Sequence, residues 1–345
     1  MSSNRLTELE LRRWHGDNLD NNILFCGAVE KLLSGIIRKH DIPFHSITGR
    51  VKKIDSLLRK CEKKGYSSTD EITDIVGIRV ITFILEDAQK ICDLIKEQFN
   101  VDESNSIDKS SELGVDKTGY RSVHYTVRID SSRCNLPEWD GHKEQVLEIQ
   151  IRTLLEHAWA SLSHDNLYKF SGVLPKEIER EFYLLAGNLE YLDAGLQSLS
   201  DKLNTYKDKV GEDTRKGKLD IEINSTSLAE YLNKKFNNFD DWPHFEKTFR
   251  EVDDRIIYEL KKFGINFISD LDEITPEKFP KEYIERRNSY LGLLRHIMLI
   301  ADADKYFENC HNYWVFSKNT YEVLKGLVNN LDSIVKKHGV RVVSM

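Results

Sequence analysis

Several features that mark membrane, secreted or zinc-ribbon proteins are missing from this sequence. No apolar run approaches the roughly 18–20 residues that a membrane span needs. The N-terminus, Met1 to Glu10, has neither the apolar core nor the cleavage site of a signal peptide. The five cysteines stand far apart without a C-x-x-C pair, which argues against a zinc ribbon and favours reduced thiols. We therefore expect a soluble, cytoplasmic protein without a membrane partner.

The charge balance argues against a global attraction to nucleic acid. The net charge is −7, so binding to nucleic acid would need a local basic patch. With 345 residues the chain is long enough for two ordinary domains. Residues 206–219 are charged and rich in helix breakers, which predicts a linker. We expect one domain over residues 1–205 and a mostly helical domain over residues 220–345.

Residues 146–152 are the most informative segment. Read as a strand, they place apolar side chains on one face and Glu148, Gln150 and Arg152 on the other. The apolar face can pack into a core, whereas a row of carboxylate, amide and guanidinium groups suits a polyphosphate pocket. The alternative is a half-exposed strand whose charged residues face water. Residues 122–129 alternate in the same way, with His124 on the polar face.

Residues 50–64 carry an apolar stripe that is typical of a helix. The stripe leaves Lys52, Ser56 and Lys60 on another face at i, i+4 and i+8. Arg50 would lie at the preceding turn, where its planar guanidinium suits a phosphate. The alternative is a solvated, lysine-rich helix face.

The rest of the N-terminal half predicts an alternation of helices and strands. We expect helix over much of 1–47, a strand over 75–83, a helix over 87–99, a loop over 102–118, and helix from 153 to about 205 with a break near Pro175.

Four short segments occur one after another along the chain. Together they form a signature that is far more specific than any single one of these segments. They are Thr48-Gly49-Arg50-Val51-Lys52, Asp74-Ile75-Val76-Gly77-Ile78-Arg79, Thr118-Gly119-Tyr120-Arg121-Ser122-Val123-His124, and the run from Glu148-Ile149-Gln150-Ile151-Arg152-Thr153 through His157-Ala158-Trp159-Ala160 to Tyr168-Lys169. Together they resemble the signature of the RelA/SpoT alarmone synthetase family, in its small synthetase-only or toxin-type form. The resemblance covers about residues 40–205. It implies an α/β (α+β) fold, a mixed β-sheet flanked by helices and related to nucleotidyltransferases.

The resemblance also implies an activity and a set of site residues. The activity is transfer of the β,γ-pyrophosphate of ATP to the 3′-OH of GDP or GTP, with Mg²⁺ as cofactor. Asp74 and Glu148 would hold the magnesium, which needs few protein ligands beside phosphates and water, and Glu148 could also act as a base. The ATP phosphates would be bound by Arg50, Lys52, Ser56, Lys60 and Arg79. The acceptor would be bound by the stacked ring of Tyr120 together with His124, Gln150, Lys117, Arg121 and Arg152.

Further residues of the matching helical stretch have weaker assignments. His157 and His164 are additional candidates for substrate contact, whereas Trp159 and Tyr168 are expected to pack rather than to act in catalysis.

Two questions stay open at the level of sequence. Asp116-Lys117-Thr118 stands where the family often carries Asn or Ser before Gly-Tyr, so the acceptor could instead be the 3′ end of tRNA or an adenine nucleotide, as in a toxin-type relative. A catalytically silent regulator is disfavoured because both acids and the basic set are present. The C-terminal domain could serve as a regulatory or dimerisation module, a fused antitoxin or a phage sensor. We therefore expect a homo-oligomer, an antitoxin or a phage protein as alternative partners.

Overall fold

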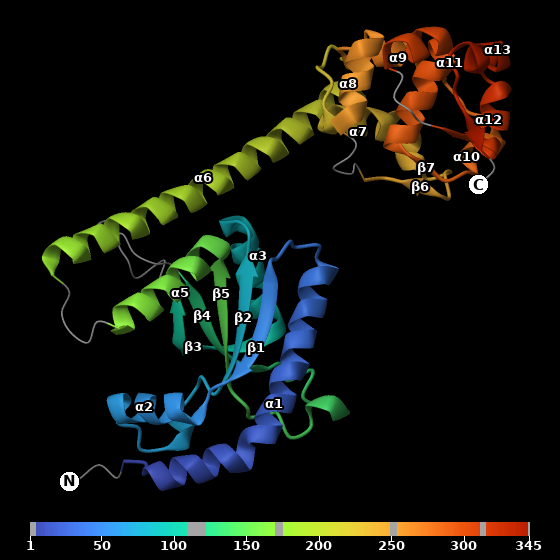
Figure 1. Cartoon of the computed structure of the whole chain (residues 1–345). Helices are drawn as coiled ribbons and strands as arrows, with labels where there is room; N and C mark the ends of the chain where they lie inside the picture. The colour runs from blue at the N-terminus through green and yellow to red at the C-terminus, as the bar shows by residue number, and fades with distance from the viewer. Residues whose placement is uncertain (1–4, 109–121, 170–174, 249–253, 311–314, 344–345) are drawn as a thin grey trace. The chain divides into compact units, whose positions relative to one another are not determined.

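The chain is described by a computed structural model that covers residues 5–108, 122–169, 175–248, 254–310 and 315–343. It divides into two compact units, residues 1–200 (unit 1) and residues 201–345 (unit 2) (Figure 1). All five cysteines are free thiols. Within the described ranges, no helix combines the length and apolar character that crossing a membrane requires.

Unit 1 is built on a five-stranded mixed sheet with the order β1-β2-β5-β4-β3. Strands β2 and β5 pair in parallel, and the other neighbours pair antiparallel. The sheet confirms the expected mixed topology, but residues 102–108 are part of β3 rather than of a loop, because a register shift lets this polar segment pair with β4. The strands are β1 (Ser46–Val51), β2 (Val76–Thr82), β3 (Phe99–Asp108), β4 (Val123–Ile129) and β5 (Leu147–Thr153).

Helices α1 (Glu8–Lys39) and α3 (Leu85–Gln98) cover the apolar face of this sheet. Their buried residues form one core with alternate residues of the strands, including Ile78, Val127 and Ile149. Each fully buried aliphatic side chain of this kind contributes about 1.5–3 kcal/mol. The opposite face of the sheet is therefore left to polar side chains, and helix α2 (Ile54–Lys64) follows β1 at its edge.

Two long helices continue from β5, namely α5 (Leu154–Lys169) and α6 (Lys176–Arg215). Helix α6 runs unbroken through residues 206–215, so the predicted linker over 206–219 is wrong for most of its length. Its lysines and acidic residues are adequate helix formers, and the single Gly211 costs only about 1 kcal/mol. The stop comes at Gly217, whose positive φ of 73° suits a residue without a side chain.

Unit 2 is mostly helical, as expected. Its core combines aliphatic residues with aromatic ones, among them Phe239, Trp242, Tyr283 and Tyr290. Two short parallel pairs, β6 with β7 and β8 with β9, join its loops. The elements are α7 (Ser225–Lys235), β6 (Phe245–Glu246), α8 (Asp254–Phe263), α9 (Ile268–Ile274), α10 (Lys281–Ile284), β7 (Asn288–Ser289), α11 (Tyr290–Cys310), β8 (Phe316–Ser317), α12 (Lys318–Lys325), α13 (Leu331–Lys337) and β9 (Val342–Val343).

Candidate active site

The strand registers gather the predicted site residues on the polar face of the sheet. Residues that pair directly across strands share a face, and alternate residues along each strand lie on that same face. Two adjacent rows result, the first Arg50, Gly77, Glu148 and Thr126, the second Thr48, Arg79, Gln150 and His124.

Gly77 leaves open space between the Arg50 and Glu148 strands. A Cβ atom built there would meet only the Glu148 carbonyl oxygen at 3.9 Å and the Arg50 Cγ at 4.0 Å. A larger side chain would extend into the polar face between a guanidinium and a carboxylate. The first row therefore has room for a ligand that needs both groups.

Glu148 is held by a chain of hydrogen bonds along this face. His124 Nδ1 lies 2.9 Å from Glu148 Oε1, and Gln150 Nε2 donates to Glu148 Oε2 at 2.7 Å. On the far side of the imidazole, Arg152 Nη2 and the Ser122 hydroxyl lie 3.1 and 3.0 Å from His124 Nε2. Each side chain of this hydrogen-bonded series holds the next one in place, so the Glu148 carboxylate is pre-positioned.

The electrostatic environment keeps Glu148 ionised. Burial raises its pKa, but the hydrogen bond and charge of His124, the hydrogen bond from Gln150 and the charge of Lys60 outweigh burial and lower the pKa to about 2. The influence of Lys60 is informative, because this lysine also binds the second predicted acid, Asp74. One ammonium group thus acts on both carboxylates.

Asp74 sits just before β2 and is bound by two lysines. Lys60 Nζ lies 2.7 Å from Asp74 Oδ2, and Lys52 Nζ forms an ion pair with the same oxygen. The three side chains are about one-fifth exposed, so the pairs are better shielded than surface salt bridges. The other carboxylate oxygen, Oδ1, is buried without a hydrogen-bond partner.

The structure corrects how Lys52 and Lys60 come together. The sequence pattern predicts that both lie on one helix face, but helix α2 begins at Ile54 and residues 46–51 form β1 rather than helix. Lys52 follows the end of β1, where His15 Nε2 lies 2.8 Å from its carbonyl oxygen and its own N–H donates to the Ile75 carbonyl. Asp74 is the point at which the two lysines meet.

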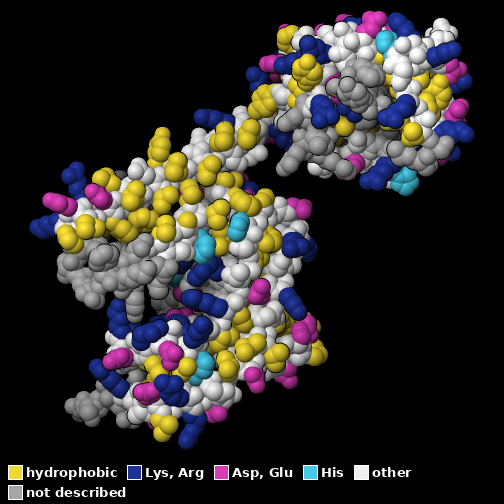
Figure 2. Space-filling model, in the orientation of Figure 1, with side chains coloured by type: hydrophobic (Ala, Val, Ile, Leu, Met, Phe, Trp, Pro, Cys, Tyr) yellow, Lys and Arg dark blue, Asp and Glu magenta, His cyan; other side chains and the backbone are white. Residues whose placement is uncertain are grey.

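A group of cationic and imidazole side chains adjoins this cluster. Burial lowers the pKa of His157 on α5, and the positive charges of Arg79, Arg152 and His45 lower it further, so these groups lie close together. Figure 2 shows Lys and Arg side chains gathered in a hollow of unit 1 between α2 and α5. Such a concentration of positive charge on the polar face suits a polyphosphate ligand.

The remaining predicted residues are distributed as follows. Arg50 is exposed on β1, and Ser56 lies half-buried on the first turns of α2, where its hydroxyl accepts a hydrogen bond from Arg59 at 3.3 Å. Trp159 is buried and packs on the Phe182 ring at 4.3 Å, which confirms a packing role. The acceptor residues Lys117, Tyr120 and Arg121 lie outside the described residues, as do the side chains of His164 and Tyr168.

Two positioning residues were missed at the level of sequence. His15 contacts Lys52 from 37 residues away, and nothing in the helical pattern around it signals that contact. The strand pattern of residues 122–129 places Ser122 on the same polar face as His124 but gave no sign of its hydrogen bond to the imidazole.

Comparison with known families agrees with this arrangement. Residues 49–172 match the model of the region found in RelA / SpoT proteins, and the segment contains both carboxylates and both lysines. This part of the chain is similar to the RelA/SpoT family. The resemblance seen in the four motifs is thereby confirmed.

Two curated RelA/SpoT relatives come from Bacillus subtilis (strain 168). GTP pyrophosphokinase YjbM is 32% identical over 142 residues, which are 40% of this chain and 63% of that relative, so the match spans slightly less than two thirds of its length. GTP pyrophosphokinase YwaC is 26% identical over 203 residues, or 57% of this chain and 90% of that relative.

Two solved structures are also similar to this chain. Small alarmone synthetase 1 from Bacillus subtilis is 24% identical, covers 56% of this chain and 98% of its own, and gives a TM-score of 0.46. A GTP pyrophosphokinase family protein from Streptococcus pneumoniae is 25% identical, with coverages of 56% and 96% and a TM-score of 0.46.

The donor set of this site would suit a magnesium ion. Magnesium prefers a small number of carboxylate oxygens together with phosphate oxygens and water. Asp74 offers a buried oxygen, Oδ1, that has no hydrogen-bond partner, and Glu148 is held in its ionised form. Lys52 and Lys60 supply the positive charge at Asp74 in this structure. Asp74 and Glu148 are therefore the residues that would hold the ion.

The lowered pKa of Glu148 predicts a pH dependence of stability. Because the folded pKa of about 2 lies below the ordinary value of 4.5, the interaction stabilises the fold above about pH 4.5 and is lost as the pH falls towards 2. The loss amounts to at most about 3 kcal/mol. We expect Glu148→Gln to lose less unfolding free energy than the wild type between about pH 6 and about pH 3 in urea titrations. Equal losses in the two proteins would contradict this assignment.

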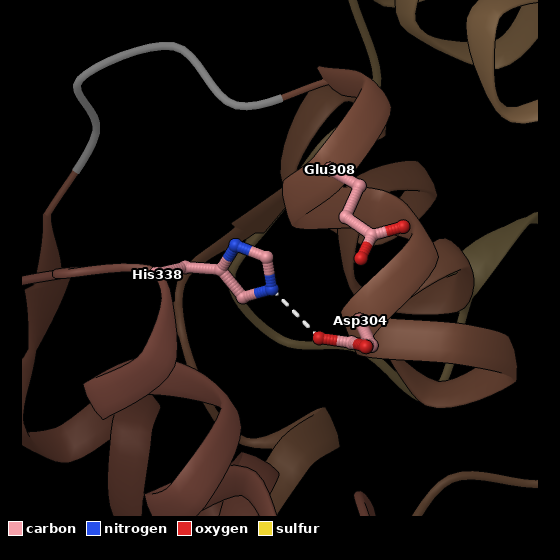
Figure 3. Close-up of side chains that lie close together, drawn as sticks. All are labelled: Asp304, Glu308 and His338. Atoms are coloured by element: carbon pink, nitrogen blue, oxygen red, sulfur yellow. Dashed lines mark hydrogen bonds and ion pairs between the residues drawn. The ribbon is translucent and has the colours of Figure 1, made fainter.

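Unit 2 holds a second group of side chains with metal-ligand chemistry, Asp304, Glu308 and His338 (Figure 3). His338 Nε2 lies 2.7 Å from Asp304 Oδ1. Lys337 Nζ already forms ion pairs with Asp304 at 2.6 Å and with Glu308 at 3.3 Å. The lysine balances these exposed carboxylates, so the group is a surface ion-pair network rather than a metal site.

Proposed function

We propose that the chain is a pyrophosphokinase that transfers the β,γ-pyrophosphate of ATP to the 3′-hydroxyl of GDP or GTP and so makes the alarmone (p)ppGpp. The observation that supports this most directly is the pair of acids, Asp74 just before β2 and Glu148 on the polar sheet face, which Lys60 links. Two relatives of this chain are named GTP pyrophosphokinase, at 32% and 26% identity.

The reaction assigns a distinct task to each part of the face. A bond forms between the acceptor 3′-oxygen and the β-phosphorus of ATP, the bond from that phosphorus to the α,β-bridging oxygen breaks, and AMP leaves. Transfers of this kind depend on positioning and on neutralising phosphate charge. Lys52, Lys60 and Arg79 would bind the phosphate oxygens, and Asp74 with Glu148 would hold magnesium, which when bound supplies further positive charge.

The pKa of Glu148 bears on how the hydroxyl proton is handled. An efficient general base has a pKa near the working pH, and a carboxylate with a pKa of about 2 is far from it. We therefore assign Glu148 to orienting the attacking hydroxyl and holding the metal, with the hydroxyl proton passing to water as the new bond forms. His124 and Gln150 keep the carboxylate in place for this task.

An assay with competing acceptors tests the proposal. ATP labelled on the γ-phosphate is incubated with the protein, Mg²⁺ and one of four acceptors, GDP, GTP, an adenine nucleotide or tRNA. We expect labelled product with GDP or GTP and one AMP for each pyrophosphate transferred. Transfer only to tRNA or to the adenine nucleotide would replace the alarmone reaction with a toxin-type one. Absence of transfer to all four acceptors would contradict the proposed activity.

A further inference from the structure

Unit 2 contains a polar cavity of about 450 Å³ whose lining residues all lie between Glu246 and Thr320. Its walls come from β6 and the β7 strand that pairs with it, the segment that follows α10, the first turns of α11, and α12 (Figure 1). This volume is ordinary for a small-molecule site. Polar and cationic side chains make up most of the lining, among them Thr248, Arg286, Arg287, Ser289, His296 and Thr320.

Arg286 brings to this cavity a guanidinium without a counter-charge. The residue follows α10 and is half-buried, and its Nη2 donates a hydrogen bond to the Thr320 hydroxyl on α12. Its Nη1 is buried without a hydrogen-bond partner. Burial lowers the pKa of Arg286, and no carboxylate of a described residue forms an ion pair with it. A buried cationic donor in this state is costly until an anion approaches it.

The first turn of α12 holds the Arg286 guanidinium in place. The Thr320 N–H donates to Ser317 Oγ at 3.1 Å, and the two hydroxyl oxygens lie 2.8 Å apart. Ser317 thus caps the helix and fixes the hydroxyl that accepts from Arg286. A planar guanidinium anchored in this way loses little conformational freedom when it binds a ligand.

The start of α11 adds backbone donors to the same cavity. This helix begins at Tyr290 directly after β7, and both Leu291 and Gly292 line the cavity. The first N–H groups of a helix lack intrahelical acceptors and carry partial positive charge. The Gly292 N–H donates to Ser289 Oγ at 3.3 Å, and no side chain at Gly292 covers the turn.

His296 is a second polar group of the lining that the protein satisfies only in part. Its side chain is buried, and Nδ1 lies 2.6 Å from the Tyr283 hydroxyl. Nε2 has no hydrogen-bond partner among the described residues. Burial lowers the pKa of His296 to about 3, and the charges of Arg286 and Arg295 lower it further, so the ring is neutral at pH 7. A neutral imidazole can form one more hydrogen bond without adding charge.

The charges of the lining favour an anion. One carboxylate, Glu246, also lines the cavity, but neither Arg286 nor Arg287 forms an ion pair with it. The two guanidinium groups therefore leave an excess of positive charge. Guanidinium groups and helix N-termini are the groups with which proteins commonly bind phosphate oxygens.

We propose that the unit 2 cavity binds a sugar phosphate, either free or as part of a mononucleotide. A phosphate monoester offers three acceptor oxygens and nearly two negative charges, which match Arg286, Arg287 and the first turn of α11. The cavity is larger than a single phosphate group, and its hydroxyl and imidazole groups suit the hydroxyls of a sugar. This site is separate from the carboxylates and lysines of unit 1, so the proposal does not depend on the reaction proposed for them.

Hydrogen–deuterium exchange of the full chain tests the proposal, because its peptides report on unit 2 separately from phosphate binding in unit 1. We expect millimolar ribose 5-phosphate or AMP to slow exchange at residues 290–293, inorganic phosphate to do so more weakly, and ribose to have no effect. The stronger of the first two probes identifies the free sugar phosphate or the nucleotide as the source. Unchanged exchange with both would overturn the proposal. An equally strong effect of inorganic phosphate would overturn the assignment to a sugar phosphate.

Two variants show whether the cavity is the binding site. Arg286→Ala and Arg287→Glu should each raise the ribose 5-phosphate concentration for half-maximal protection at least about tenfold, because each removes a charge-assisted contact. Arg287 is exposed, so its replacement should not disturb folding, and unchanged exchange in α8 checks the fold of Arg286→Ala. Arg255→Glu is the matched control, because Arg255 is exposed on α8 and does not line the cavity. Protection that persists at the wild-type midpoint in both cavity variants would overturn the proposal.

Discussion

Replacing Glu148 with glutamine should reduce pyrophosphate transfer at least about 100-fold while leaving the fold intact. The amide keeps the size of the side chain and one acceptor oxygen for Gln150, but it removes the negative charge that His124 and Lys60 stabilise. Loss of a preorganised charged group at a phosphoryl-transfer site has this magnitude. Asp74→Asn should have a comparable effect because Asp74 is the second carboxylate that Lys60 acts on.

Steady-state turnover with saturating ATP and GDP or GTP checks this expectation, with circular dichroism to confirm folding. Asp87→Asn is the matched control, because Asp87 is also a buried carboxylate but lies on α3, against the apolar face of the sheet. Its turnover should stay within about twofold of wild type. If both site variants keep near-normal turnover, neither acid holds the metal.

The strands that carry the site could be predicted because one face of the sheet is buried. In β5 the apolar residues alternate with Glu148, Gln150 and Arg152, and the structure places the apolar set in the core. A shift of one residue would bury the charged set, so the sequence pattern alone determines the face of each side chain. The same reasoning located His124 on β4.

The elements that were predicted wrongly depend on contacts between distant segments. Residues 46–47 and 50–51 fall at the ends of two segments predicted as helical, but pairing with β2 satisfies their backbone groups and makes them part of the sheet. The segment 102–108 becomes β3 for the same reason. In α6, by contrast, charged residues that read as a linker extend a helix that is already nucleated by its N-terminal half.

The residues of the site also divide into those that the local sequence pattern predicts and those that contacts between distant segments bring together. Local alternation predicts which residues of β4 and β5 share the polar face, whereas the meeting of Lys52, Lys60 and Asp74 comes from three separate elements. The helix-face argument predicted that the two lysines lie near each other, but for an incorrect geometric reason. Only the structure shows that His15 anchors the backbone from which Lys52 reaches Asp74.

The second large effect that we expect is a loss of ATP binding when Lys52 or Lys60 is replaced. Lys52→Ala and Lys60→Ala should each weaken the binding of a non-hydrolysable ATP analogue roughly 10- to 100-fold, since a charge-assisted phosphate contact contributes about 1.5–3 kcal/mol. Removal of either lysine also leaves Asp74 with less positive charge nearby, which further disfavours a bound polyphosphate.

Titration calorimetry in the presence of Mg²⁺ measures this effect directly. Lys63→Ala provides the control, because Lys63 is exposed on the same helix α2 and should leave affinity unchanged. The double variant at Lys52 and Lys60 should lose less than the sum of the single losses, because both lysines bind one carboxylate oxygen of Asp74 and so act as a unit. Unchanged affinity in both single variants would mean that the lysines serve only to hold Asp74, and the phosphates would then have to be bound by the arginines of the sheet face.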